Sequence, residues 1–150
     1  MFGLYWSRGQ KIFHTKGHPT FTTGATTGDI IDIIDFLAAS SSQSTSSLGQ
    51  RLSECVQDGR FQIIDDLFWC QPIAFWDMPE HIYHYLHNNR LVIVKGNTNY
   101  RRLFGDRQWS LDIDKRDILG YFPVPFCILR TCHDSEMGPP YHDCQLYDKK

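Results

Sequence analysis

The stretch "LVIVKGNTNYRRLF", residues 91–104, decides the expected fold. It begins with four consecutive apolar residues, reaches Gly96, and continues at once with amides, a tyrosine and two arginines. An apolar run without alternation is typical of a strand that is covered on both faces, as in a parallel α/β sheet. We therefore expect a buried strand at 91–96 and a helix that opens through residues 99–104.

The rest of the chain alternates between strand and helix patterns. Apolar residues bounded by turn signals predict further strands at 11–16, 60–65 and 126–131. Helical spacing predicts helices at 29–39, with Asp29 as the N-cap, and at 48–59 and 79–89. This order predicts one α/β domain over residues 1–150, a layered (α/β/α) arrangement with a mainly parallel sheet.

Two segments interrupt this alternation. The serine-rich residues 40–47 have little to bury and are expected to form a polar linker. Residues 67–79 carry four large aromatics around two prolines and are expected to form an irregular wall over the sheet. Four aromatic side chains are suited either to stacking on a sugar or to the protein core: Trp69, Phe75, Trp76 and Trp109. Large aromatic rings contribute mainly buried area, which favours the core.

Composition narrows the functional class. With 15 Lys and Arg against 17 Asp and Glu, the net charge is -2, so there is no general attraction to nucleic acid or to an anionic membrane. No apolar run approaches the roughly 20 residues of a membrane span. The five cysteines show no CxxC spacing and are interpreted as free thiols in an intracellular, cytoplasmic protein. The histidine triad at 81, 84 and 87 is interpreted as an exposed helix edge in preference to a metal site.

The polar residues after the strand at 91–96 form the candidate site. Ligands of open α/β sheets lie beyond the carboxyl ends of the strands. Asn97 and Asn99 supply amide donors there, backbone N–H groups at a helix start favour anions, and Lys95 and Arg101 add positive charge, which together suit a phosphate. The alternative is that Asn97 and Thr98 only cap a helix and that the arginines are solvated. The stretch is no Walker loop, because it lacks the glycine spacing and the lysine followed by serine or threonine.

Four stretches, in order, resemble one known family. "LVIVKGNTNYRRLFGDRQW" is similar to the lysine-glycine-aspartate-x-asparagine-tyrosine-arginine segment of the metal-dependent damage-control phosphatases, in the acidic-residue-methyltransferase-like subfamily that hydrolyses sugar phosphates. "HTKGHPTFTTGATTGD" resembles that family's H-x-K-x-x-P-x-F-V-S-D-A-T-x-x-D loop. "DDLFWCQPIAFWDMP" resembles its aromatic segment, and "PVPFCILRTCHD" its arginine-threonine-x-lysine motif. The resemblance runs from roughly residue 10 to 134.

The resemblance implies a phosphatase that uses manganese, cobalt or nickel and acts on a sugar or nucleotide phosphate monoester. It implies that residues 95–101 bind the substrate phosphate, with Lys95 and Gly96 supporting the loop. Arg130 and Thr131 match the arginine-threonine-x-lysine motif, and His133 stands where that motif has lysine. The implied substrate residues are thus Asn97, Thr98, Asn99, Tyr100, Arg101 and His133.

The chain also departs from the family pattern. The family's aspartate-asparagine pair belongs upstream of the first residues here, so the sequence corresponds to a C-terminal portion of the fold. Gly24 stands at the position of a metal-binding aspartate, and Asn97 replaces another aspartate. A hard divalent cation needs several oxygen ligands, so its affinity should be strongly reduced. The tail, residues 135–150, no longer resembles the family and is expected to be divergent or disordered.

Two functional interpretations stay open. The first is the C-terminal portion of a phosphatase, active only if an upstream segment or a partner restores the missing ligands; the second is a non-catalytic remnant or phosphate-binding module. The candidate replacements for the lost ligands are instead expected to serve as caps, turns or core residues: Asp29, Asp65, Asp66, Asp77, Asp106, His14 and His18. Asp106 is equally suited to pair Arg107 or an upstream arginine. Apolar runs at 91–94 and 126–129 predict an exposed sheet edge and self-association.

Overall fold

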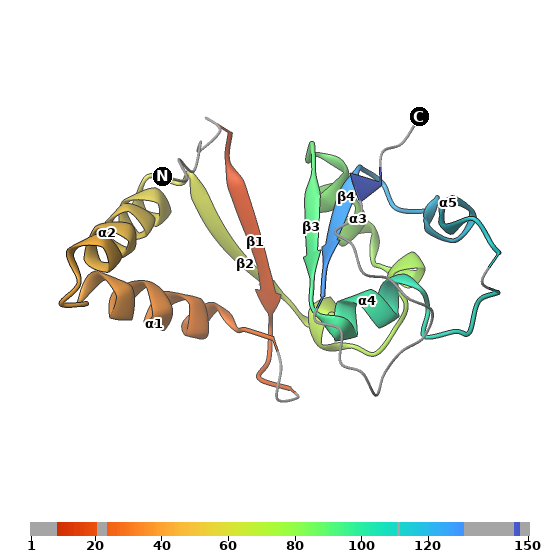
Figure 1. The fold of residues 1–150 in the computed structure, drawn as a ribbon, viewed down its shortest axis with the longest axis horizontal. Coiled ribbons are helices and arrows are strands. Elements are labelled where there is room, and N and C mark those ends of the chain that lie inside the picture. The colour runs from red at the N-terminus through yellow and green to blue at the C-terminus, as the bar shows by residue number, and fades with distance from the viewer. Residues whose placement is uncertain (1–8, 21–23, 111, 131–145, 148–150) are drawn as a thin grey trace. The chain divides into compact units, whose positions relative to one another are not determined.

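The computed structural model describes residues 9–20, 24–110, 112–130 and 146–147 (Figure 1). They form two compact units, residues 1–71 and 72–150, which are described separately below. The helices and strands of the first unit are β1 Lys11–Lys16, α1 Thr27–Ala38, α2 Gln43–Gln57, β2 Phe61–Asp66 and the 3-10 helix η1 Leu67–Cys70. Those of the second are η2 Phe75–Asp77 (a 3-10 helix), α3 Glu80–His87, β3 Val92–Lys95, α4 Asn97–Leu103, α5 Lys115–Leu119, β4 Phe126–Leu129 and β5 Leu146–Tyr147.

The first unit is a parallel strand pair with a helical hairpin. β1 and β2 pair in register from Lys11 with Phe61 to Lys16 with Asp66, and α1 and α2 pack on each other to one side of this sheet (Figure 1). Apolar residues at helical spacing place Ile34 of α1 and Cys55 of α2 in the interior. The strands expected at 11–16 and 60–65 are therefore confirmed.

The start of α1 differs from the expectation. Thr26, not Asp29, is the N-cap: its side chain accepts a hydrogen bond from the Asp29 backbone N–H, and the Asp29 carboxylate accepts one from the Thr26 N–H at 2.8 Å. This reciprocal capping box places Asp29 in the first turn, three residues after the cap. The hydrogen bond from the Thr26 backbone lowers the pKa of Asp29, so the carboxylate is charged where the helix start favours it.

The expectation of a polar linker at 40–47 is wrong, because α2 already begins at Gln43. Serine is a weak helix former, but here a serine stabilises the contact between α1 and α2: the Ser46 hydroxyl donates to the Ala38 carbonyl at 2.8 Å. Gly49 then lets the two helices approach closely, since a Cβ at this position would lie 2.2 Å from Ala38 N. Tertiary packing, which the local composition does not encode, extends the helix toward its N-terminus.

The second unit is built on β3, β4 and β5. β3 pairs with β4 in parallel, from Val92 with Phe126 to Lys95 with Leu129, and β5 adds to β4 in antiparallel fashion. Large side chains with at most 3% exposure form its core; they are Phe75, Ile82, Leu86, Leu103, Phe122 and Phe126. The tail expected to be divergent includes β5, and its other residues lie outside the described part of the chain.

β3 is not covered on both faces as expected. Val94 is buried, but Ile93, on the opposite face, is 62% exposed. β3 is the first strand in the sheet order β3-β4-β5, and the face that bears Ile93 is not packed against the core of this unit. β4, Phe126–Leu129, lies within the strand expected at 126–131 and is mostly buried, with Phe126, Cys127 and Ile128 inside. Thr131 lies outside the described residues.

The aromatic residues 67–79 form short 3-10 turns instead of a regular element, as expected from their composition. Asp66 caps η1 by accepting from the Phe68 backbone N–H at 2.7 Å, and Phe68 is buried. In the second unit, Phe75 of η2 is 1% exposed. The preference for a core role over sugar stacking holds for Phe75, whereas Trp69, Trp76 and Trp109 are only partly buried.

The α/β class and the parallel pairing are thus confirmed, although the described strands form two small sheets where one was expected. The short helix α5, capped by Asp114, was not predicted. Within the residues described, no helix has the length and apolar character needed to cross a membrane. Among these same residues Cys55 and Cys70 are free thiols, which agrees with the interpretation of the cysteines.

Candidate phosphate-binding site

The candidate site lies where β3 ends and α4 begins. Gly96 separates the two elements with φ of 99°, in the region that glycine adopts without strain. A Cβ at this position would meet nothing within 4 Å, so the glycine is required for its backbone conformation and not for space. The sharp turn brings Asn97, the first residue of α4, directly to the carboxyl end of the sheet.

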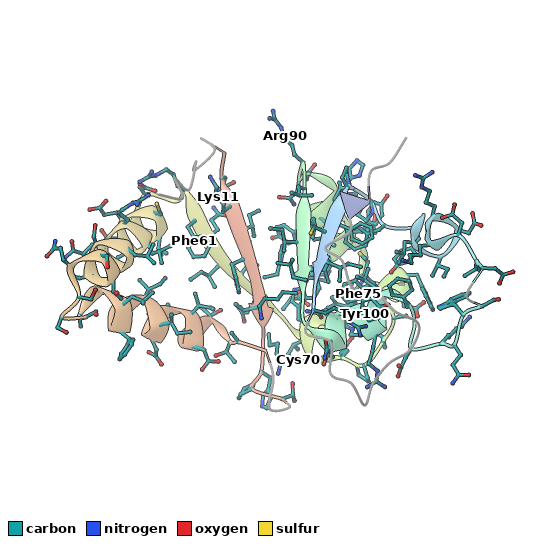
Figure 2. All side chains as sticks on the ribbon, viewed as in Figure 1. Lys11, Phe61, Cys70, Phe75, Arg90 and Tyr100 are labelled. Atoms are coloured by element: carbon teal, nitrogen blue, oxygen red, sulfur yellow. The ribbon has the colours of Figure 1, made fainter. Side chains whose placement is uncertain are left out.

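The ladder between β3 and β4 brings the second predicted motif to the same place. Lys95 is in register with Leu129, and the Gly96 N–H donates to the Leu129 carbonyl at 2.8 Å. Arg130 follows at once, with its guanidinium carbon 4.3 Å from the ring centroid of Tyr100, which Figure 2 labels on α4. Two predicted site residues from separate motifs therefore lie in contact. Thr131 and His133 lie outside the described residues.

Two buried polar atoms at this end of the sheet have no hydrogen-bond partner among the described residues. They are Oδ1 of Asn97, an acceptor, and Nε of Arg130, a donor. Buried polar atoms are nearly always paired, and an orphan calls for a physical reason. A bound polar group that carries both acceptors and donors would satisfy both atoms.

The remaining amide and hydroxyl of the loop have different surroundings. The Asn99 side-chain amide donates to the Lys95 carbonyl at 2.9 Å, so one of its N–H groups braces the turn. Thr98 is exposed. Lys95 is exposed at the end of β3, where it adds a positive charge to the rim of the loop. The capping interpretation of Asn97 and Thr98 gains no support, because no side-chain hydrogen bond caps α4.

Arg101 is held by a carboxylate, as expected for one of the arginines upstream of Asp106. Its Nε donates to Asp106 Oδ1 at 2.7 Å and its Nη2 donates to Oδ2 at 2.6 Å, a bidentate pair. The hydrogen bond with Arg101 lowers the pKa of Asp106, so the carboxylate stays charged. Asp106 is thus assigned to shaping the loop and not to holding a metal.

One residue that supports the site was missed by the sequence analysis. Arg102 is 5% exposed, its Nε donates to the Ile73 carbonyl at 2.8 Å, and its guanidinium lies 4.8 Å from the centre of the Phe75 ring. It therefore ties α4 to the aromatic segment before α3. Arginine is expected in solvent by its residue type, and no local pattern marked this one as buried.

The described residues do not fit the divalent metal that the resemblance implies. Gly24 has no side-chain ligand, and a Cβ there would lie 2.7 Å from Cδ of Lys16. Lys16 is itself 9% exposed, and its ammonium donates to the Thr20 carbonyl. A cationic side chain therefore fills the space that a carboxylate at position 24 would enter. Phe21, Thr22 and Thr23 lie outside the described residues.

The other candidate ligands do not assemble into a metal site. Across residues 9–20, 24–110, 112–130 and 146–147, no three His, Cys, Asp or Glu side chains are grouped so as to hold a metal ion. Asp29 completes the capping box of α1 from its first turn, and Asp66 caps η1. Asp65 and Asp77 do not join such a group, and His18 is exposed. The His14 ring lies against Trp69, with 5.4 Å between ring centroids and an interplanar angle of 51°, in keeping with a core role. His81, His84 and His87 are exposed on α3.

Comparison with known proteins agrees with this arrangement. The family model described as the damage-control phosphatase ARMT1-like domain matches residues 7–137. Proteins named damage-control phosphatase ARMT1 are similar over 123 residues, with 32% identity for Mus musculus, 30% for Homo sapiens and 34% for Xenopus tropicalis. These alignments cover 79% of this chain and 28% of each relative, so the chain spans little more than a quarter of their length. Because the family model covers residues 7–137, most of the sequence, the chain belongs to the damage-control phosphatase family of ARMT1-like domains.

Proposed function

We propose that this chain forms the phosphate-binding portion of a phosphatase that acts on a sugar phosphate or a related small phosphate ester. Residues 95–101 and Arg130 are the proposed contacts, and Thr131 and His133 extend the set. The observation that carries the proposal is the pair of buried unsatisfied atoms, Asn97 Oδ1 and Arg130 Nε, at the junction of two family motifs. A sugar phosphate offers anionic oxygens to the arginine and hydroxyl donors to the amide oxygen.

Charge at the loop supports an anionic ligand. Lys95 is the last residue of β3, and Arg130 directly follows β4. The negative charge of Asp106 is balanced by its ion pair with Arg101. An arginine binds phosphate through hydrogen bonds as well as charge, and a dry, partly buried setting strengthens both. The alternative role of Arg101 and Arg102 as a solvated face does not account for Arg102, which is 5% exposed, whereas the Arg101 side chain is 65% exposed. Arg130 lies outside that alternative; it is partly buried and contacts Tyr100.

Phosphate-ester hydrolysis assisted by manganese, cobalt or nickel belongs to the family proposal. A bound divalent ion would polarise the phosphate and neutralise its developing charge. Because Gly24 and Lys16 do not fit such an ion, we assign no step of the reaction to it in this chain. This misfit favours the second candidate function, a non-catalytic phosphate-binding module that retains the scaffold.

Location and association are part of the same proposal. An intracellular, cytoplasmic location is supported by the free thiols of Cys55 and Cys70. Self-association is supported by the exposed Ile93 of the edge strand β3. Size-exclusion chromatography with light scattering tests it: we expect a species above the 17.5 kDa monomer, shifted to monomer by Ile93→Lys. A monodisperse monomer of the unmodified chain would refute it.

The test of function is a thermal melt of the full chain with glucose 6-phosphate, with manganese, and with both. A ligand at about 100 times its Kd stabilises the folded state by about 2.7 kcal/mol, which raises the midpoint by roughly 5 to 10 °C for a chain of this size. Arg130→Gln should abolish the shift. Arg90→Gln, which removes an exposed arginine just before β3, should leave it intact.

The outcomes separate the candidates. A shift with glucose 6-phosphate alone supports the binding module, and a shift that requires manganese supports the phosphatase, to be followed by a phosphate-release assay. If no combination moves the midpoint, or if Arg130→Gln and Arg90→Gln respond alike, the assignment of residues 95–101 and Arg130 as the phosphate site is wrong.

A further inference from the structure

Asp106 combines three features that a solvated aspartate rarely shares. It holds Arg101 through two hydrogen bonds of 2.7 and 2.6 Å, and its backbone N–H donates to the Arg101 carbonyl at 2.8 Å. Its φ is 54°, and in the part of the chain that the structure describes it is the one non-glycine residue with positive φ. The main chain and the side chain of Asp106 therefore both form hydrogen bonds with Arg101.

The turn that carries Asp106 is fixed from the aromatic segment. Gly105, with φ of 66°, lies against the indole of Trp76 so closely that a Cβ would be 1.8 Å from Cη2. Trp76 is in turn packed edge-on against Tyr121, at 5.8 Å between ring centroids. Tyr121 donates from its hydroxyl to the Leu103 carbonyl at 2.9 Å, at the end of α4. The backbone on which Asp106 sits is thereby tied to the helix that bears Arg101.

We propose that Asp106 is a positioning residue for Arg101, which it holds in the orientation that receives the substrate phosphate. The inference rests on the proposed function of residues 95–101 as the phosphate loop. The Arg101 side chain is 65% exposed, and a long arginine side chain on a surface commonly samples several rotamers. Binding its Nε and Nη2 edge to the Asp106 carboxylate fixes the plane of the guanidinium before the ligand arrives.

A purely electrostatic role of Asp106 and a positioning role predict opposite changes in phosphate binding when the carboxylate is removed. A carboxylate beside an anion site repels the anion and competes for the arginine, so its removal would tighten phosphate binding. Positioning predicts that removal weakens binding, because the ligand must then order Arg101 itself. The sign of the change in Kd upon Asp106→Asn distinguishes the two roles.

The experiment measures the Kd for glucose 6-phosphate by isothermal titration calorimetry on the full chain. We expect Asp106→Asn to weaken binding by about 3- to 10-fold, the equivalent of immobilising one long side chain. Asp117→Asn, which removes the same charge from the exposed first turn of α5, should bind within about twofold of the unmodified chain. In an Arg101→Gln background, Asp106→Asn should have no further effect, because its action passes through Arg101.

A ligand-free signature accompanies the titration. The Arg101 Nε–H signal in a nitrogen-edited NMR spectrum should be sharp and slowly exchanging, and Asp106→Asn should broaden or lose it. The thermal midpoint of Asp106→Asn should fall by no more than about 3 °C, as expected for an exposed ion pair. Should that variant not fold, Arg101→Lys keeps the charge without the planar fork and should weaken binding to a similar degree.

The failures are distinguishable. Equal or tighter binding by Asp106→Asn, or an equal loss in the Arg101→Gln background, overturns the positioning role while the phosphate site stands. If Asp106→Asn does not fold and Arg101→Lys binds as tightly as the unmodified chain, the positioning role is likewise overturned. No binding by the unmodified chain overturns the proposed function and, with it, any role for Asp106 in positioning.

Discussion

Gly49 is the residue at which α1 and α2 come closest, and its replacement by alanine gives a quantitative test of the first unit. The added Cβ would lie 2.2 Å from Ala38 N and 2.6 Å from both Ala38 Cα and Leu37 C. Carbon contacts settle near 3.5 to 4.0 Å, so the helices must separate by about 1 Å. The opposing atoms are backbone, and no side-chain rotation relieves the contact.

The expected loss follows from two opposing effects. Alanine improves the helix propensity of α2 by about 1 kcal/mol relative to glycine. Overpacking costs about 1 to 3 kcal/mol, and contact with rigid backbone places Gly49→Ala at the upper end. The net destabilisation is therefore about 2 kcal/mol, a fall in the thermal midpoint of roughly 4 to 8 °C.

Gly28→Ala in α1 is the matched control, because the nearest atom to its Cβ is Thr26 Oγ1 at 3.8 Å. It gains propensity without a clash and should stabilise the chain by up to about 1 kcal/mol. Thermal and urea melts followed by far-UV circular dichroism measure both variants. If Gly49→Ala melts at or above the unmodified chain, or if the two variants shift in the same direction, the close approach of α1 and α2 is wrong.

Three further predictions concern other parts of the fold. Gly105→Ala should cost about 3 kcal/mol or more, because the position combines a positive φ with the Trp76 ring; urea melts measure this, and an unchanged midpoint would exclude the contact. Arg102→Met should lower the free energy of unfolding by about 2 kcal/mol, because the Ile73 carbonyl loses its hydrogen-bond donor. Urea melts measure this, and a stability equal to that of the unmodified chain would contradict it. Burial lowers the pKa of His14, against the raising effect of the Asp66 carboxylate, so the unfolded chain binds the proton first as the pH falls. Stability should hold above about pH 6.5 and decrease below it, and His14→Gln should remove that part of the pH dependence in urea melts between about pH 7.5 and 5; identical profiles for both proteins would refute the assignment.

Local periodicity predicted the strands and most of the helices, because each of these elements buries residues that are close in sequence. Local periodicity did not predict the start of α2. Ser46 and Gly49 stabilise this part of the helix through contacts with Ala38 in the preceding helix, and local composition does not reveal such contacts. The N-cap of α1 was within reach of the sequence, since Thr26 and Asp29 have capping-box spacing.

The site was predictable to the extent that it depends on strand order. Once β3 and β4 are parallel neighbours, the residues that follow them must meet, and Tyr100 and Arg130 do. The role of Arg102 was not predictable, because its carbonyl partner, on Ile73, is 29 residues away and no local pattern marks an arginine as buried. The exposure of Ile93 was missed for a similar reason, since an apolar run does not reveal whether both faces of its strand are covered.

The hydrogen bond between Gly96 and Leu129 constrains where the chain can change length during evolution. An insertion of one residue inside β4 would turn Arg130 to the opposite face of the sheet and remove it from Tyr100. An insertion between Trp109 and Asp114, a stretch that joins the phosphate loop to α5, leaves that register intact. Length differences among related sequences should therefore collect between Trp109 and Asp114, while the four residues of β3 and the four of β4 keep their count.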